Sequence, residues 1–440
     1  MACGQNVDTL FLQKKMKKDL GVFKEIRLKA NSGLYMYRTK EQIDSTCNWA
    51  ENEIMTSITY LDFYNIICEL TDFEGSLHND TELSKKHLSN LKKESYGYFP
   101  YPIKWVEGKW IINYDNVEIP LGAEITEING KPIAEIIYTL HKYYPTDGQN
   151  ITGKRIGLRS HFPVYYRYKY GQQDSFQITF RKNQTGALEN RTLEGVSYEA
   201  YFKNFRKLHS LPLDRLYYTN LKENQKYSFK KSDATTGVLT IHTFSMGNET
   251  SMEHEKYSNF LDSVFTKINE DGLKNLIVDV RLNNGGTDPN DVVTYSYLSS
   301  RKFQESKQVC ASFQKVPMLK YYESSVPRFL RPFGVGKYNR ILRKRFPLEK
   351  DGRYFISELE NEMKVRSPQE NAFTGNIYLL VSPTVASAGS LFAAMVAGNE
   401  NTTVIGEETM GGYYGHNGHT EVAYVLPKSK IITSFFMDNI

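Results

Sequence analysis

The sequence predicts an α/β protein whose chain passes from helices to strands and then to a mixed region, and three observations support this. Residues near 8–29 and near 59–70 place apolar side chains at helical spacing. From residue 98 the chain changes to short runs with strand-like alternation. Beyond residue 237, β-prone apolar runs such as 377–382 are followed by helix-prone segments such as 386–398.

The chain has 440 residues, enough for about three domains of ordinary size. We expect a helical N-terminal domain over 1–95, a β-rich domain over 96–205 and a mixed core over 206–440. A hydrophobic content of 40% and an aromatic content of 13% are typical of well-filled cores, not of disorder.

The net charge of +5 is unevenly distributed. The segment 328–353 contains nine Lys or Arg and two acidic residues, so the rest of the chain is slightly negative. A nucleic-acid-binding protein would spread positive charge along one face. We therefore expect no nucleic-acid partner, and we interpret the basic segment as a surface lip of the core.

The four cysteines have no CxxC spacing, and no metal or redox pattern is present, so we expect neither a cofactor nor a metal. No run approaches the length of a membrane helix, and the first ten residues contain no signal-like apolar region. Cys3, followed by Gly and Gln, is compatible with a lipoprotein site whose signal was replaced by Met. On that interpretation the expected location is the cell envelope or periplasm, with an association to the envelope.

The N-terminal segment predicts three helices. The first, over 8–29, has a Lys-rich outer face and ends near Asn31 and Gly33. The second begins at Thr39, with Glu41 and Gln42 in its first turn, and the third is expected over 59–70. A short polar loop with His78 follows the third helix, and a histidine in such a loop is either a surface residue or a functional one.

The middle segment predicts strands. Glu107-Gly108 is a hairpin turn signal, and a strand over 123–129, the turn Asn129-Gly130 and a helix over 132–143 match a PDZ-like domain. In such a domain the loop at Leu121 and Gly122 would bind a peptide carboxylate through backbone N–H groups. Residues 150–205, including PVYYRYKY and SFQITFRK, are predicted to continue as strands.

Ser387 lies where the apolar strand 377–382 gives way to the helix 386–398. The first-turn N–H groups of that helix and its dipole would point toward the hydroxyl, and the same N–H groups can stabilise an oxyanion. Such a serine is therefore either a nucleophile or an N-cap that only begins the helix. A second buried strand, 276–280, runs into Arg281 and a glycine turn.

The string Asp279-x-Arg-x-Asn-x-Gly-Gly, followed about a hundred residues later by Ser387-Ala-Gly-Ser and then Ile405-Gly-Glu-x-Thr-x-Gly-Gly, resembles the C-terminal processing (tail-specific) serine peptidases. The resemblance implies a crotonase-like β/α core and a peptide or protein substrate. It further implies Ser387 as the nucleophile, with an oxyanion hole from Gly285, Gly286 and the N–H of Ala388.

More than one residue is a candidate for the general base that takes the proton of the Ser387 hydroxyl. In the Ser-Lys branch of the family a lysine lies roughly 25 positions after the serine, but Gly412 stands there. In tricorn-like members a histidine serves, which would be His78 with Ser76 supporting it. His416, in the glycine loop that borders the site, is another base or a substrate-binding residue. His416 and His419 have no evident third ligand, so they predict no metal site.

The chain ends in the apolar run 431–437, and the glutamate that supports the histidine in tricorn-like members would fall near or beyond Ile440. We therefore expect a core that lacks a C-terminal portion and exposes an open strand edge.

The function predicted is that of a serine peptidase with a histidine base. The alternative is an inactive relative that binds peptides or apolar ligands.

Overall fold

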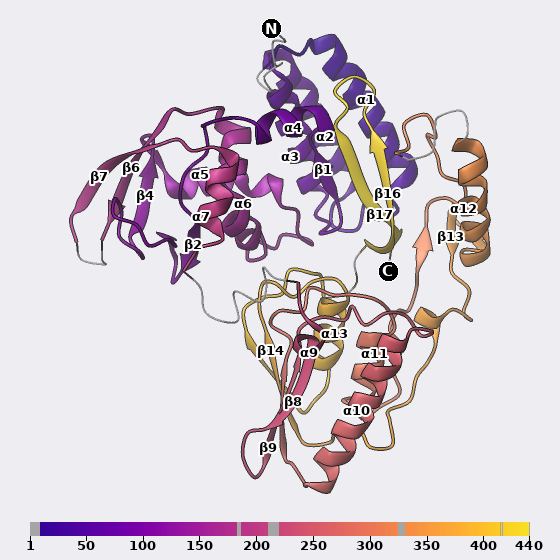
Figure 1. Cartoon of the computed structure of the whole chain (residues 1–440). Helices are drawn as coiled ribbons and strands as arrows, with labels where there is room; N and C mark the ends of the chain where they lie inside the picture. Colours follow the sequence, from indigo (N-terminus) through magenta and orange to yellow (C-terminus); the bar gives the residue numbers. More distant parts are fainter. Residues whose placement is uncertain are drawn as a thin grey trace. The chain divides into compact units, whose positions relative to one another are not determined.

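The structure is a computed structural model that describes residues 9–182, 186–209, 220–323, 331–413, 415 and 417–439. It contains two compact units, which Figure 1 colours along the sequence. Unit 1 comprises residues 1–209, 316–337 and 419–437, and unit 2 comprises residues 210–315, 338–418 and 438–440. The region that the sequence predicted as one mixed core, 206–440, is therefore divided between the two units.

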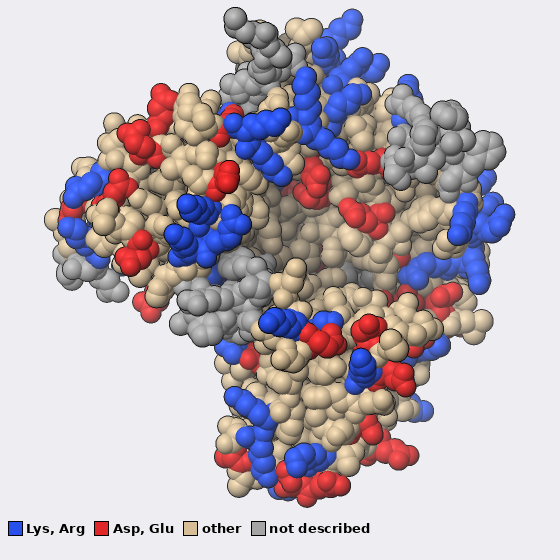
Figure 2. All heavy atoms as spheres, in the orientation of Figure 1, with Lys and Arg blue, Asp and Glu red and all other residues tan. Residues whose placement is uncertain are grey.

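Unit 1 begins with three helices, as the sequence predicted: α1 (Gln13–Ala30), α2 (Lys40–Thr56) and α3 (Tyr60–Phe73). Thr39 and Thr59 begin α2 and α3 with capping boxes, in which the threonine side chain accepts a backbone N–H and the third helical residue bonds back. All lysines of α1 except the half-buried Lys24 are exposed, and Figure 2 shows basic side chains gathered over this part of unit 1.

The remainder of the N-terminal half of unit 1 contains a twisted antiparallel sheet with the strand order β2-β3-β4-β6-β7, and β5 pairs with β4. Glu107 and Gly108 form the predicted hairpin turn, and both have positive φ, as do Asn129 and Gly130 at the second turn. The elements are β2 (Ile103–Val106), β3 (Lys109–Ile112), β4 (Glu124–Ile128), β5 (Lys131–Pro132), α5 (Ile133–Leu140), η1 (His141–Tyr143), β6 (Ser175–Arg181), β7 (Leu188–Glu194) and α7 (Tyr198–Phe205).

One predicted strand in this region is wrong. The segment PVYYRYKY belongs to α6 (Lys154–Tyr170), a helix that contains Pro163 and ends at Gly171, whose φ is +78°. Leu158, Phe162 and Tyr166 recur every fourth residue and are all buried, so helical periodicity prevails over the local alternation of aromatic and polar residues. The following segment, SFQITFR, forms β6 as predicted.

A second sheet of unit 1 joins segments from both ends of the chain. β1 (Asp80–Glu82) pairs antiparallel with β17 (Ile432–Asn439), which also pairs with β16 (Asn417–Val425). α4 (Lys85–Lys92) follows β1. The expected open edge at 431–437 is wrong, because β17 has a partner on each side and Phe435 and Met437 are fully buried.

Unit 2 is built on a sheet with the order β15-β14-β10-β9-β8, in which all pairs are parallel except β8 with β9. Tyr257, Leu261 and Phe265 of α10 bury one helix face in the same core as Leu276 and Val278 of β10. The elements are α9 (Glu223–Lys226), β8 (Tyr227–Lys231), β9 (Thr236–Ile241), α10 (Met252–Glu270), β10 (Asn275–Asp279), α11 (Asn290–Ser296), β14 (Asn376–Val381), α13 (Ala388–Ala397) and β15 (Thr402–Gly406). The α/β class and the β/α core are thereby confirmed.

Shorter elements complete the described chain: β11 (Cys310–Ala311), β12 (Leu348–Lys350), β13 (Arg353–Phe355) and η2 (Asn361–Met363) belong to unit 2, while α12 (Arg331–Arg345) includes residues of both units. Arg345, at the end of α12, pairs within unit 2 with Glu362 at 2.7 Å and with Asp438 at 3.3 Å. Among the helices described here, none is long and apolar enough to cross a bilayer.

Candidate active site

The candidate site of unit 2 begins at the end of β10, where the Asp-x-Arg-x-Asn-x-Gly-Gly string forms a rigid turn. The Arg281 guanidinium binds the Asp279 carboxylate through two hydrogen bonds of 2.9 and 2.7 Å. The Asn283 side chain donates to Ile241 O at 3.3 Å and accepts the Gly285 N–H at 3.0 Å. These bonds hold the turn in register with β9, so the two glycines that follow have a fixed backbone position.

Ser387 lies directly before α13 in a backbone conformation that L-residues rarely adopt, with φ 51° and ψ −130°. Its side chain caps no N–H of the helix, so the interpretation of this serine as an ordinary N-cap is wrong. A residue held at such φ and ψ stores of the order of 1–3 kcal/mol of strain. Ser387 is also partly exposed.

Two glycines allow the Ser387 turn and the glycine turn to approach each other closely. A β-carbon on Gly285 would stand 2.9 Å from Ser387 Cβ and 3.2 Å from Ala388 N. A β-carbon on Gly389 would stand 2.4 Å from Asn283 O. Both distances are shorter than ordinary van der Waals contacts, so the sequence needs glycine at these places to bring Ser387 against the end of β10.

The backbone N–H groups around Ser387 are not equivalent. Gly285 N–H donates to Asn283 Oδ1, and Gly389 N–H donates to Ala386 O at 2.9 Å. In the part of the chain that the structure describes, no hydrogen bond uses the N–H of Gly286 or that of Ala388. Gly286 is exposed and Ala388 is buried, and both N–H groups can still donate to a bound group.

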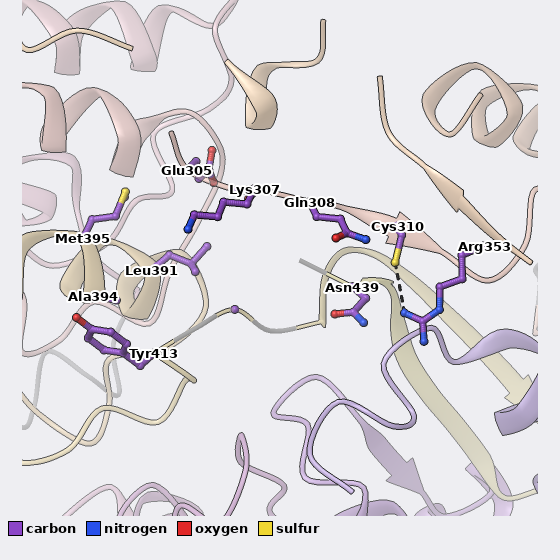
Figure 3. A pocket seen from close by; sticks show the side chains of 12 residues that line it. Glu305, Lys307, Gln308, Cys310, Arg353, Leu391, Ala394, Met395, Tyr413 and Asn439 are labelled. Atoms are coloured by element: carbon purple, nitrogen blue, oxygen red, sulfur yellow. Dashed lines mark hydrogen bonds between the residues drawn. The ribbon is translucent and has the colours of Figure 1, made fainter. Parts of the chain in front are cut away.

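A pocket of about 520 Å³ lies beside α13 within unit 2. Its apolar wall comes from Leu391, Ala394 and Met395 of α13, and Figure 3 shows the Lys307 side chain extending toward this wall. Arg353 also lines the pocket, and its Nη1 donates to Cys310 Sγ at 3.7 Å. A substrate group that is apolar along its length and negative at its end matches such a lining.

In unit 1, the loop that carries His78 is fixed by a buried ion pair. Glu74 Oε1 lies 3.0 Å from Arg27 Nε, and Glu74 Oε2 accepts from Asn31 at 3.0 Å and Asn79 at 2.5 Å. Leu77 N–H donates to Asp147 Oδ1 at 2.8 Å. The loop is therefore anchored on both sides of His78.

The His78 ring packs on the Phe436 ring of β17, with 4.4 Å between their centroids. Burial, with a contribution from the nearby His419, lowers the pKa of His78 from 6.5 to about 4. The ring is therefore neutral at ordinary pH, which is the form a general base requires. Ser76 Oγ is buried and makes no hydrogen bond to a described residue, so Ser76 does not hold the His78 ring in this structure.

The other predicted site residues are placed as follows. Gly122 closes a turn with φ +82°, and its N–H donates to Ile112 O at 2.9 Å, so this N–H is not available to a peptide carboxylate. Leu121 is 39% exposed in the same turn. His416 lies outside the described residues. Ser387, Gly285, Gly286 and Ala388 belong to unit 2, whereas His78, Ser76, Leu121 and Gly122 belong to unit 1.

Comparison with known protein families gives independent support for these motifs. Residues 235–424 match the sequence profile of peptidase family S41. This segment is a peptidase family S41 domain. The match begins at β9 and includes β10, β14, Ser387 and α13, and it confirms the family resemblance read from the motifs. No curated protein matches the chain.

Solved structures share the fold around the S41 domain. Mature CPAF is 13% identical with a TM-score of 0.58, over 97% of this chain and 90% of that chain. Mature CPAF complexed with lactacystin gives 13% identity and a TM-score of 0.57 over the same shares. A CPAF mutant gives 12% identity and a TM-score of 0.59, over 98% of this chain and 90% of that chain. At these identities the likeness shows the common fold.

Sequence reasoning missed several charged residues around the S41 site. Lys307 and Glu305 line the pocket beside α13, and Asp288 and Asp291 follow the glycine turn. The spacing of Asp288 and Asp291 directly after Gly-Gly-Thr was a local signal that went unused. Glu305 and Lys307 had no such signal, because only the folded chain brings their segment to α13.

Proposed function

We propose that the chain is a serine-type peptidase in which Ser387 is the nucleophile. The observation that carries the proposal is the strained Ser387 conformation beside two available N–H groups, those of Gly286 and Ala388. A hydroxyl at such a turn is presented to substrate, while the same turn supplies the donors for the oxyanion.

In the proposed reaction, Ser387 Oγ attacks the carbonyl carbon of a peptide bond and loses its proton to a base. The carbonyl oxygen becomes an oxyanion that accepts hydrogen bonds from the N–H of Gly286 and of Ala388. The base then protonates the leaving amine, and an acyl-serine remains. Water deprotonated by the same base releases the acid and restores Ser387.

We propose His78 as the base, because Gly412 removes the lysine expected in the Ser-Lys branch and His78 is neutral at ordinary pH. His416 is the competing candidate. Substrate selection is proposed to involve the C-terminal end of a peptide at the loop of Leu121 and Gly122, through groups other than the Gly122 N–H, which is already bonded to Ile112 O. A location in the cell envelope likewise remains a proposal.

The test of the nucleophile is covalent labelling with a fluorophosphonate. We expect the wild-type chain to be labelled and Ser387→Ala to remain unlabelled while folded. The matched control is Ser228→Ala, which removes an exposed serine of β8 in the same unit and should leave labelling unchanged. A folded wild-type chain that takes no label would contradict the proposal and favour the alternative of an inactive peptide-binding relative.

A further inference from the structure

The pocket beside α13 lies on the same side of that helix as Ser387. Leu391, Ala394 and Met395 line the pocket, and they follow Ser387 by four, seven and eight residues. Residues at these spacings share one face of a helix. The Leu391 N–H donates to Ser387 O at 3.1 Å, so the helical hydrogen bonds already begin at the serine. The opposite face, with Phe392, is buried in the core of unit 2.

The loop after β15 links the Ser387 turn to the pocket by a second route. The Gly411 N–H donates to Ser390 Oγ at 3.2 Å, and a β-carbon on Gly411 would stand 3.4 Å from Ser387 N. Two residues further on, Tyr413 lines the pocket. The pocket therefore continues the surroundings of Ser387 along α13.

Two cationic side chains, Lys307 and Arg353, line this pocket. Lys307 is exposed and has no ion pair or hydrogen bond within the described chain, and Figure 3 shows its side chain extending toward the α13 wall. Arg353 is also exposed, and it donates only to Cys310 Sγ, at 3.7 Å, among the described residues. Because a guanidinium has five N–H donors, Arg353 retains several for a bound group.

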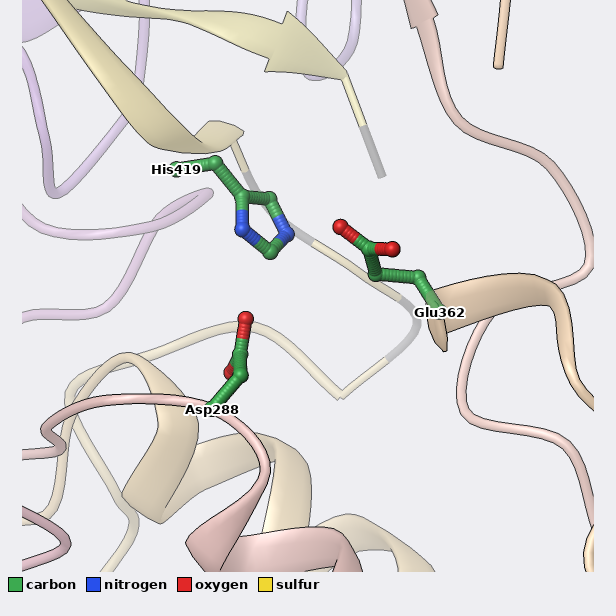
Figure 4. Close-up of side chains that lie close together, drawn as sticks. All are labelled: Asp288, Glu362 and His419. Atoms are coloured by element: carbon green, nitrogen blue, oxygen red, sulfur yellow. The ribbon is translucent and has the colours of Figure 1, made fainter. Parts of the chain in front are cut away.

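Glu305 is the acidic side chain of the pocket wall, and it does not neutralise these cations. Burial, followed by the charges of Asp291, Asp288 and Glu362, raises the pKa of Glu305 to about 9, and Arg366 opposes this only in part. Figure 4 shows Asp288 and Glu362, which have carboxylate oxygens within 4.8 Å of each other. Glu305 is therefore protonated near neutral pH, and the wall of the pocket is positively charged.

We propose that this pocket selects peptide substrates that carry an acidic side chain, above all glutamate, near the cleaved bond. The methylene stem of the glutamate would pack on Leu391 and Met395, and its carboxylate would bind the Lys307 ammonium. Arg353 would bind a second negative group of the same peptide. The inference rests on the proposed function, because it gives the pocket a role in choosing what Ser387 cleaves.

The helix geometry also gives the position of the acidic residue in the substrate. Leu391 and Met395 lie one and two turns beyond Ser387, which is about 6 and 12 Å along the helix axis at about 1.5 Å per residue. An extended peptide advances about 3.3 Å per residue. An acidic side chain about two to four residues from the cleaved bond therefore reaches this wall.

The experiment measures peptide binding to the full chain with Ser387→Ala, so that no cleavage occurs. The probes are fluorescent peptides built of three Leu-X-Ala repeats, in which X is Glu, Gln or Lys, so that one X can reach the pocket in any register. We expect the Glu peptide to bind about threefold to fivefold more tightly than the Gln peptide, because a partly exposed ion pair changes affinity by a few fold. The Lys peptide should bind most weakly. Adding Lys307→Glu should reverse this order.

The matched control is Lys256→Glu, which changes an exposed lysine of α10 in the same unit and alters the net charge equally. This variant should keep the order Glu, Gln, Lys. The inference is overturned if no peptide binds, if the Glu and Gln peptides bind equally, or if Lys307→Glu keeps the original order. A reversal that only Lys307→Glu produces supports it, since a misfolded variant would not gain affinity for the Lys peptide.

These outcomes are distinct from those of the fluorophosphonate test, because the binding assay does not use the Ser387 hydroxyl. A chain that is labelled at Ser387 but shows no preference for glutamate would overturn this inference and leave the peptidase proposal standing. A chain that takes no label but shows the preference and its reversal would support acidic-peptide recognition by the pocket and contradict the peptidase proposal.

Discussion

The backbone strain at Ser387 predicts that glycine at this position stabilises the folded chain. Ser387→Ala and Ser387→Gly both remove the hydroxyl, but only glycine relieves a conformation with φ 51° and ψ −130°. Relief of such strain is worth about 1–3 kcal/mol. The greater freedom of glycine in the unfolded chain opposes this by about 0.5–1 kcal/mol. We therefore expect Ser387→Gly to be more stable than Ser387→Ala by about 1 kcal/mol, and both to be inactive.

The measurement is urea unfolding followed by circular dichroism, because the three tryptophans, Trp49, Trp105 and Trp110, all belong to unit 1 and do not report on unit 2. Ala394→Gly is the control, since it lies inside α13, where glycine should destabilise by about 1 kcal/mol. If Ser387→Gly is less stable than Ser387→Ala by the same amount as this control, Ser387 is not strained and the argument for a presented nucleophile fails.

Three further predictions concern the S41 site. Gly285→Ala should slow fluorophosphonate labelling at least about tenfold, because the added β-carbon would stand 2.9 Å from Ser387 Cβ. The control is Gly272→Ala, since Gly272 also has positive φ but open space around it, and this variant should be labelled at the normal rate. Equal labelling rates in the two variants would show that the contact between Gly285 and Ser387 is unimportant. With His78 as the base and its pKa lowered to about 4, kcat/KM should rise about tenfold per pH unit below pH 4 and be level above it. His78→Gln should abolish turnover, while His416→Gln should retain it. A midpoint of the pH profile near 6.5, or full activity of His78→Gln, would exclude His78 as the base. Peptides with a free C-terminal carboxylate should be cleaved faster than their amides, and equal rates would remove the tail-specific part of the proposal.

The sequence alone was sufficient for the core of unit 2 because each signal there is local. The apolar runs 276–280 and 377–382 are long enough to be buried strands, and glycines mark the places where backbones approach. The position of Ser387 between strand and helix followed from the same reading. Its strain did not, since φ depends on the contacts of the whole turn.

Other features depended on contacts between distant segments and were not predictable. The aromatic alternation around Tyr166 favoured a strand, but burial on several sides produced α6. Asp291 and Glu305 have carboxylate oxygens close to each other, and no spacing in the sequence marks their approach. Likewise, the polar loop of His78 gave no sign that the ring would pack on Phe436 or that burial would lower its pKa.

The pairing of β1 with β17 bears on when the protein can become active during its synthesis. Thr433 in β17 bonds to Asp80 O across 353 residues of chain, and the buried Asp19 carboxylate accepts the Ser429 N–H across 410. At translation rates of about 5–20 residues per second, β1 waits roughly 20–70 s for its partner strand. Such long-range pairing is also intrinsically slow to form.

The His78 ring gains its contact with Phe436 only when β17 has been added. By then Ser387 has long been made, because it precedes β17 in the chain. A nascent chain that has not yet reached β17 would therefore contain the proposed nucleophile but not the finished surroundings of the histidine. With His78 as the proposed base, the order of these elements in the sequence would delay proteolysis until β17 has been made and has paired with β1.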